Sequence, residues 1–465
     1  MEKETRKEYD TMGSMDVPID CLWGAQTQRS IENFRVGNER MPIEVIHALA
    51  LIKKSCALVN FQMNLITQEL RDLIVFACEE ILTGKLDDQF PLVVWQTGSG
   101  TQTNMNLNEV ISHVANLKFG SKIGDKHPVH PNDHVNLSQS SNDVIPTAII
   151  VAVMMKIHQQ LLPSLQVFYE ALDEKAKEFD SIVKCGRTHL MDAVPMTLGQ
   201  EFSGFAMQIK NAMQNLLYAA ESAAEIPLGG TAVGTGLNTK AGFSEKIAKK
   251  ISELSQVNLR TSPNKFEAIG SMDRLVHVSG ALRTVAVAFM KIANDLRLLG
   301  SGPRCGLGEL KLPSNEPGSS IMPGKVNPTQ CEMLTQVCAQ VLGNDVTCAI
   351  AGGGGHLQLN AYRPVLAYNI LQSIHLLSEG GLNFTKRCVT GLEPDRVTIK
   401  KHLENTLMLV TALNSHIGYE KSAKIAKLAH EKGITLKEAA IELGFLSKEE
   451  FEAFVRPEKM AKPNF

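Results

Sequence analysis

A repeat of apolar residues every three or four positions is the feature that most constrains this chain. From Val278 to Leu299 the apolar residues follow spacings of 4, 3, 4, 3, 4 and 3, and the segment from Leu198 to Leu216 repeats the pattern. Such a seam is typical of long helices that pack side by side. We expect helices around residues 144–178, 197–225, 272–299, 328–350 and 361–391. Helices of about 25 residues span nearly 40 Å, so the sequence predicts an elongated bundle.

The fold class is predicted to be mainly α. Strand-like alternation is sparse, and aromatic residues make up 5% of the chain, so the core must be largely aliphatic, which suits packed helices. A length of 465 residues, at roughly 150 per domain, indicates about three domains. We expect a mixed, mostly helical N-terminal domain over residues 1–137, a central long-helix bundle over 138–395 and a small helical C-terminal domain over 396–465. In the last of these, Ser447 followed by Glu450 is a candidate capping box.

Charge and cysteine content exclude several function classes. The chain has 47 Lys and Arg against 49 Asp and Glu, a balance that gives no general attraction to nucleic acid or to anionic membranes. Its nine cysteines form no C-x-x-C pair, which argues against a disulfide scaffold or a zinc ribbon. The first ten residues contain no apolar signal region, and charges interrupt the apolar tracts 148–163 and 276–300. We therefore expect a soluble, cytoplasmic protein.

The most informative loop runs from Pro317 to Pro328, Pro-Gly-Ser-Ser-Ile-Met-Pro-Gly-Lys-Val-Asn-Pro. Its glycines and prolines cannot continue a helix, and a helical pattern resumes directly after it. The loop gathers a lysine, an amide and two hydroxyls, which favours an anion site over a turn between domains with an exposed lysine. The spacing argues against a phosphate loop, because five residues separate Gly318 from Gly324 and Val326 stands where magnesium needs a hydroxyl.

Three further loops share this chemistry: Thr97–Asn104, Ser138–Asp143 and Gly186–Leu190. Each places small hydroxyl or amide side chains near glycine or Asn and is expected to lead into a helix, whose N-terminal N–H groups bind carboxylates well. For any one loop the alternative is simple helix capping, as by the serines at 138, 140 and 141. Four such loops in one chain favour a shared anion site.

Histidines complete the candidate set. His189, next to a basic loop residue and a predicted helix start, is placed to move protons near neutral pH, although a lone histidine is more often structural. His130 and His134 have zincin spacing, but Pro131 breaks the helix that such a site needs and no general-base Glu separates them. We therefore predict no catalytic metal. The glycine-rich stretch Gly229–Asn238 lacks a complete dinucleotide-binding pattern.

These motifs together resemble the fumarase/aspartase superfamily, and class II fumarases in particular. Gly318–Pro328 is similar to the superfamily signature, and the resemblance covers nearly the whole chain. Further matching segments are Tyr9–Asp10, Gly24–Thr27, Gly98–Thr101, His130–Asp133, Ser140–Asp143, Gly186–His189, Pro263–Ala268 and Gly418–Tyr419.

The resemblance implies a three-domain helical subunit in a homotetramer with a twenty-helix core, and active sites each built from three subunits. It implies the reversible hydration of fumarate to L-malate, with no metal or organic cofactor and a small dicarboxylate as the only partner besides the chain's own copies. By position, Ser319 resembles the residue that removes the C3 proton, Lys325 and Asn327 those that hold the carboxylate, and His189, supported by Glu332, the acid. The other residues that match substrate contacts are Ser99, Gly100, Thr101, Ser140, Ser141, Asn142, Thr188 and Ser320, and a candidate secondary anion site comprises His130, Asn132 and Asp133.

The chemistry of this reaction requires such residues. Removing a proton beside a carboxylate creates a second negative charge on it, which donors and cations must stabilise. A serine base needs neighbouring dipoles and positive charge to stabilise its alkoxide. Two alternatives stay open from the sequence. One is an aspartate ammonia-lyase with the same enolate chemistry, because the segment Leu357–Asn360 is more similar to aspartases than to fumarases. The other is a catalytically silent structural homologue.

Overall fold

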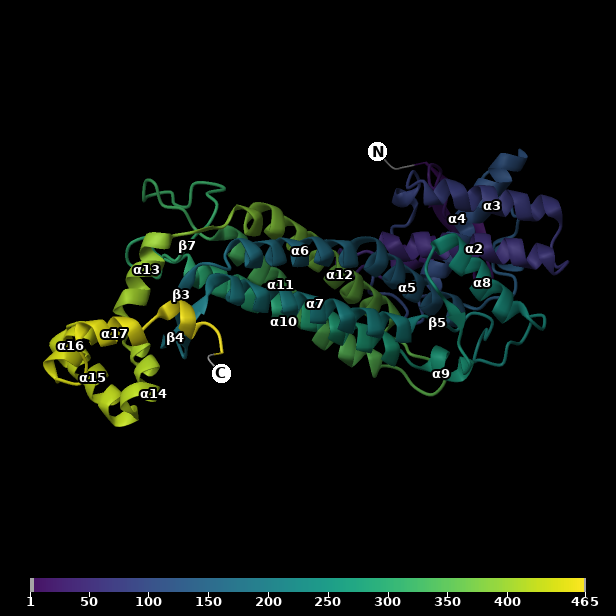
Figure 1. Cartoon of the computed structure of the whole chain (residues 1–465). Helices are drawn as coiled ribbons and strands as arrows, with labels where there is room; N and C mark the ends of the chain where they lie inside the picture. The colour runs from purple at the N-terminus through teal and green to yellow at the C-terminus, as the bar shows by residue number, and fades with distance from the viewer. Residues whose placement is uncertain (1–3, 464–465) are drawn as a thin grey trace. The chain divides into compact units, whose positions relative to one another are not determined.

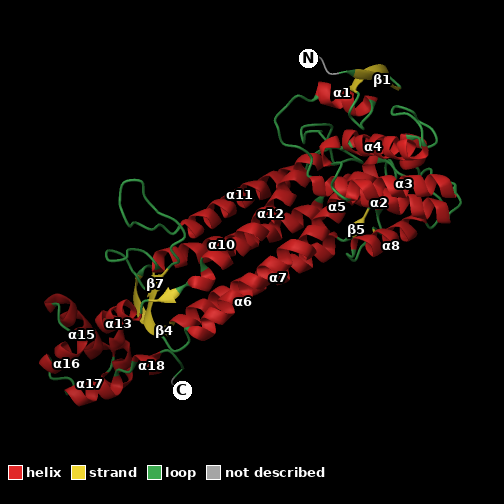
Figure 2. Cartoon of the chain, turned by 90° about the horizontal axis from the view of Figure 1, so that it is seen from above, coloured by secondary structure: helices red, strands yellow, loops and turns green. Residues whose placement is uncertain are grey.

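The computed structural model describes residues 4–463, which form two compact units. Unit 1 comprises residues up to Pro163 together with Met213–Ala286 and Ala339–Ser378, and unit 2 comprises Ser164–Ala212, Val287–Cys338 and the chain from Glu379 onward. Helices make up most of the regular structure, while strands occur only as short pairs in the described residues (Figure 2). The predicted mainly α fold is confirmed.

Five long helices are divided between the units, because each unit boundary inside the chain falls within one of them. They occupy the five segments that the apolar periodicity predicts (Figure 1). The elements are the run α5 (Ser141–Lys156), η3 (Ile157–Leu161) and α6 (Leu162–Glu178), followed by α7 (Leu198–Ala223), α10 (Asp273–Leu299), α11 (Thr329–Gly352) and α12 (Arg363–Arg387).

Both heptad seams are buried. Every seam residue of α7 from Leu198 to Leu216 and of α10 from Val278 to Leu299 is at most 6% exposed. In unit 2, Phe168 packs edge-on against Phe289 and Phe384, with ring centroids 5.2 and 5.8 Å apart. The aliphatic stripe therefore makes the core that its spacing predicts.

The rest of unit 1 is centred on α2, which contacts α3, α5 and α8 and is buried along most of its length. A β-hairpin of β1 and β2 precedes it, and β5 pairs in parallel with β6. The elements are β1 (Thr5–Asp10), β2 (Gly13–Pro18), α1 (Ala25–Asn33), α2 (Ile43–Gln62), α3 (Gln68–Leu82), η1 (Asp87–Gln89), α4 (Thr101–Phe119), η2 (Pro131–Val135), β5 (Glu225–Ile226), α8 (Phe243–Ser255), β6 (Arg260–Thr261) and α9 (Lys265–Gly270).

The rest of unit 2 consists of two short antiparallel strand pairs and a group of small helices with a common apolar core around Leu413, Ile425 and Ala439. The expected capping box of Ser447 and Glu450 is present at the start of α17. The elements are β3 (Val183–Thr188), β4 (Met191–Thr197), β7 (Leu310–Lys311), η4 (Val389–Gly391), β8 (Glu393–Pro394), α13 (Arg396–Asn405), η5 (Leu407–Leu413), α14 (Asn414–Ile417), α15 (Tyr419–Lys432), α16 (Leu436–Glu442), α17 (Lys448–Phe454) and α18 (Pro457–Met460). The three-domain division stays a prediction.

Two helical stretches, Ser141–Glu178 and Asp273–Leu299, are long and apolar enough to meet the criteria for a membrane span. Their most apolar windows are 72% and 56% buried inside the protein, as is usual for core helices of soluble proteins. Packing within the bundle therefore accounts for their apolar character.

Candidate active site

The loop before α4 places two candidate hydroxyls side by side. Gly100 is the N-cap of α4 with φ of +75°, a left-handed conformation that glycine adopts easily. The Ser99 and Thr101 hydroxyl oxygens are 2.8 Å apart, and the Thr101 N–H donates to the Ser99 Oγ over 3.3 Å. The loop thus leads directly into a helix N-terminus, as predicted.

Gly98 lets this loop lie against the start of α12. A Cβ at Gly98 would lie 1.4 Å from the carbonyl oxygen of Ala361, so no larger residue fits. The Gly98 carbonyl in turn accepts a hydrogen bond of 3.2 Å from the Arg363 N–H. Backbone contact therefore fixes the position of the loop.

The second candidate loop begins α5. Ser140 and Asp143 form a capping box, so the capping interpretation of Ser140 is correct, and Asp143 completes it. The Ser141 hydroxyl accepts a hydrogen bond of 2.9 Å from the Asn104 amide in the first turn of α4. Asn142 donates to the Ala232 carbonyl over 2.8 Å. Unit 1 therefore brings Ser99–Thr101 and Ser140–Asn142 together at two neighbouring helix starts.

Sequence reasoning missed a buried polar network behind this pair of loops. Lys53, on α2, is 1% exposed and donates to the side-chain amide oxygen (Oδ1) of Asn136 over 2.9 Å. That oxygen also accepts hydrogen bonds from Asn104 and Asn108. Burial lowers the pKa of Lys53 to about 8. The position of Lys53 within the apolar helix α2 is the sequence feature that could have indicated a buried polar network.

The secondary anion candidates lie at η2, a single π-helical turn. The His130 Nδ1 accepts hydrogen bonds of 3.2 Å from the N–H groups of Asn132 and Asp133, and the His134 Nδ1 accepts one from the His130 N–H. A cavity of about 400 Å³ in unit 1 is lined by Asn132, Asp133 and Ser140. Part of the secondary set therefore shares a cavity with a primary candidate.

Unit 2 carries the other candidates, and one expectation about them is wrong. Gly186–Leu190 does not lead into a helix: Thr188 ends β3, and His189 and Leu190 form the two-residue turn to β4, with φ of +55° and +62°. Helix α7 begins only at Leu198. His189 is therefore exposed at the tip of a hairpin. Positive φ at both turn residues is typical of a type I′ turn, for which Asn-Gly is the usual sequence, but His-Leu stands here.

A buried charge cluster holds the base of that hairpin. Glu309 is fully buried and contacts Arg187 Nη2 at 2.7 Å, His402 Nδ1 at 2.9 Å and Lys184 Nζ at 3.1 Å. Lys184 also contacts Glu201 at 2.7 Å. Burial alone would raise the pKa of Glu309, but the Arg187 hydrogen bond and the Lys184 charge outweigh it, so the pKa lies below its usual value. The sequence holds no motif that links these residues.

The signature loop, Gly318–Pro328, is held closed by hydrogen bonds between its own residues. The Gly318 N–H donates to the Lys325 carbonyl over 2.8 Å, and the Asn327 amide donates to the Gly318 carbonyl over 2.5 Å. The Ser319 hydroxyl oxygen accepts hydrogen bonds from the N–H groups of Ile321 and Met322, at 3.2 and 2.9 Å. These donors are the dipoles that an alkoxide at Ser319 requires.

The remaining candidates lie near that loop in unit 2. Ser320 and Lys325 are exposed, and so is Glu332 in the first turn of α11, which begins at Thr329 as predicted. Within residues 4–463, no hydrogen bond or ion pair joins His189 to Glu332 or to the signature loop.

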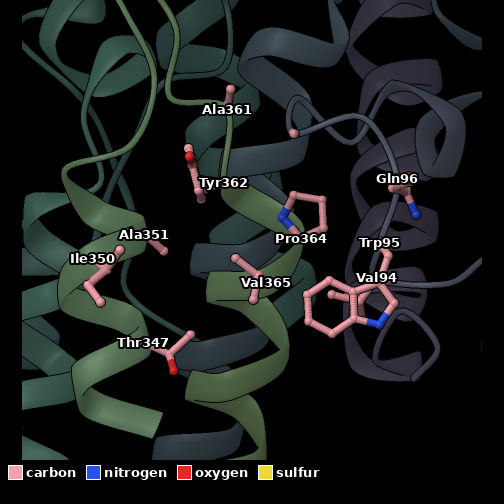
Figure 3. Close-up of a pocket in the computed structure, with 11 residues that line it drawn as sticks. Val94, Trp95, Gln96, Thr347, Ile350, Ala351, Ala361, Tyr362, Pro364 and Val365 are labelled. Atoms are coloured by element: carbon pink, nitrogen blue, oxygen red, sulfur yellow. The ribbon is translucent and has the colours of Figure 1, made fainter. Parts of the chain in front are cut away.

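Figure 3 shows a different kind of pocket in unit 1, of about 380 Å³. Trp95, Ile350 and Val365 give it an apolar lining, and Gly98 belongs to its wall. The residues predicted to bind substrate do not line it. Among the residues that line it there is no Lys, Arg or His to pair with a carboxylate.

Comparison with known protein families finds a match for two segments of the chain. Residues 13–343 match a family of lyases, and residues 409–462 match the C-terminal region of fumarase C. The class II fumarate hydratase of Thermosynechococcus vestitus is 55% identical over 99% of this chain and 98% of its own length. The human mitochondrial fumarate hydratase is 55% identical over 98% of this chain and 90% of its own.

A solved structure supports the same assignment. The crystal structure of a class II fumarase from Schistosoma mansoni superposes with a TM-score of 0.97 at 44% identity. The alignment covers 99% of this chain and all of that one. Sequence and fold therefore agree along the whole length.

Proposed function

Because the chain belongs to the class II fumarase family of lyases, we propose that it is a fumarate hydratase, which interconverts fumarate and L-malate. The observation that carries the proposal is the 55% identity to a class II fumarate hydratase over 99% of the chain. The substrate is a small dicarboxylate.

In this proposal Ser319 removes the C3 proton of malate. The two N–H donors to its hydroxyl oxygen support that role, because they stabilise a developing alkoxide. Lys325 and Asn327, on the same loop, bind the carboxylate that gains the second negative charge. His189, with Glu332 as its support, gives a proton to the departing hydroxyl, directly or through water.

The remaining candidates bind the rest of the substrate. Ser99, Gly100, Thr101 and the loop Ser140–Asn142 offer hydroxyl, amide and N–H donors at the starts of α4 and α5, where a helix N-terminus favours an anion. Thr188 and Ser320 add hydroxyls beside the acid and the base, and His130, Asn132 and Asp133 form a secondary anion site.

The proposed assembly is a homotetramer in which three subunits contribute to each active site, as the resemblance to class II fumarases implies. We place the enzyme in the cytoplasm, whose reducing conditions suit a chain with nine cysteines.

A two-substrate absorbance assay tests the activity. Purified protein is added to L-malate or to L-aspartate, and the ultraviolet absorbance of the conjugated diacid is followed. We expect it to rise with malate. A rise with aspartate alone would identify an ammonia-lyase instead, and no rise with either would indicate a silent homologue.

Mixing two inactive variants tests the shared sites. Ser319→Ala and His189→Asn proteins are combined, dissociated in mild denaturant and allowed to reassemble. If different subunits supply the two residues, hybrid tetramers contain intact sites and activity returns. Activity that stays at the level of the separate variants would indicate that both residues act within one chain.

A further inference from the structure

Asp143, in the first turn of α5, is a fully buried acid outside the substrate-binding set. Its Oδ1 accepts a hydrogen bond of 2.9 Å from the Ser140 N–H. Its Oδ2 accepts hydrogen bonds of 3.0 and 2.8 Å from the N–H groups of Gly229 and Thr231. One carboxylate thus joins the loop Ser140–Asn142 to the segment Gly229–Ala232, some 90 residues further along the chain.

The segment Gly229–Ala232 adopts a strained backbone to make these contacts. Gly229 has φ of +95° and Thr231 has φ of +54°, a conformation that is rare for a β-branched residue. The Thr231 hydroxyl is also buried and has no hydrogen-bond partner among the described residues. Left-handed residues of this kind turn their N–H groups toward one anion. Strain at such a site is a reason to look for a functional constraint.

Positive charge surrounds the carboxylate from three other elements. Lys53 on α2, Lys265 on α9 and Arg363 at the start of α12 all interact electrostatically with Asp143. Burial raises the pKa of Asp143 to about 6, against the opposing effect of its amide donors and Lys53. At neutral pH the carboxylate is therefore ionised and accepts all three hydrogen bonds.

We propose that Asp143 is a positioning residue, which holds the substrate-binding loop Ser140–Asn142 against Gly229–Ala232 and thereby sets the affinity for the dicarboxylate rather than the rate of proton transfer. The proposal rests on the proposed hydratase activity. It is supported by the contact between the Asn142 amide and the Ala232 carbonyl, which joins the same two segments. Asp143 itself does not touch the substrate.

The variant Asp143→Asn tests this role with little change of shape. An amide has one acceptor oxygen, so an NH₂ group must face either Ser140 or the two N–H groups of the other segment, and one side of the junction is lost. We expect KM for malate to rise about tenfold or more while kcat stays within about threefold, and the inhibition constant of succinate to rise in parallel.

Asp345→Asn is the matched control. Asp345 is also a buried acid on a long helix, at 6% exposure, and it accepts hydrogen bonds from Ser279 and Arg283 at 2.7 and 2.8 Å. This variant should leave KM and the succinate constant unchanged. A KM for Asp143→Asn within twofold of the parent, or an equal rise in Asp345→Asn, would overturn the proposal.

A second variant decides the matter if Asp143→Asn does not fold. Thr231→Gly keeps the N–H donor and adopts the left-handed conformation freely, so the fold should persist while the segment gains freedom. We expect KM to rise in it about threefold, and an unchanged KM would overturn the proposal. Inactivity of the parent chain toward malate and fumarate would instead refute the proposed function.

Discussion

Replacement of Glu309 by glutamine should destabilise unit 2 by about 3 kcal/mol. The side chain keeps its shape but loses the charge that faces Arg187, His402 and Lys184 at 2.7 to 3.1 Å. Loss of one partner from a buried ion pair typically costs about 3–5 kcal/mol, because a buried charge is left uncompensated. Lys184 keeps Glu201 at 2.7 Å, which favours the lower end of that range.

Urea unfolding at equal protein concentration measures the effect, since the stability of the proposed tetramer would depend on concentration. Hydrogen exchange of the β3–β4 hairpin should accelerate on the order of a hundredfold, the equivalent of about 3 kcal/mol. Glu431→Gln is the control, because it makes the same change in an exposed pair with Lys427 at 3.9 Å and should cost less than about 0.5 kcal/mol.

The difference in the free energy of unfolding between the parent and Glu309→Gln should depend on pH in a defined direction. The folded-state pKa of Glu309 lies below its usual value of 4.5, so its stabilising contribution is present above that value and is lost as pH falls through the folded pKa. The difference in the free energy of unfolding between the parent and Glu309→Gln should therefore become smaller as the pH is lowered. Equal unfolding midpoints for Glu309→Gln and Glu431→Gln at pH 7, with unchanged slopes, would refute the reasoning.

Two other sites give direct predictions. Ser319→Ala and Lys325→Ala should each reduce turnover by several orders of magnitude while the proposed tetramer persists in size-exclusion chromatography, and near-normal turnover in either would refute its proposed role. Cys305 is the exposed cysteine, so a thiol reagent should label it first in the native protein, and mass spectrometry of the labelled peptides identifies the site. Faster labelling of Cys338, where burial raises the thiol pKa to about 12, would contradict the structure.

Periodicity predicts the part of this fold that repeats. The heptad seams of α7 and α10 can be recognised in the sequence because a buried helix face must place an apolar residue at every third or fourth position. The helix caps at Ser140 and Ser447 follow from short local patterns. The loops that carry the candidate hydroxyls are equally local, so their composition reveals them.

Contacts between distant residues escaped prediction for a physical reason. The charge cluster joins Lys184 to Glu309, and Asp143 contacts Thr231, which lies 88 positions further along the chain. Neither pairing leaves a local pattern in the sequence. The His189 turn is missed because the backbone of the hairpin imposes its left-handed conformation on residues that rarely adopt it.

The approach of Gly98 to Ala361 has a consequence for the variation that this chain tolerates. The obstacle is main chain, which no rotamer change can move aside, so a library that randomises position 98 should return glycine alone among active clones. Gly98, which has no side chain and no proposed chemical role, would then score as invariant as Ser319, the proposed catalytic base. Mutational scans of this protein will need structural geometry to separate the two kinds of intolerance.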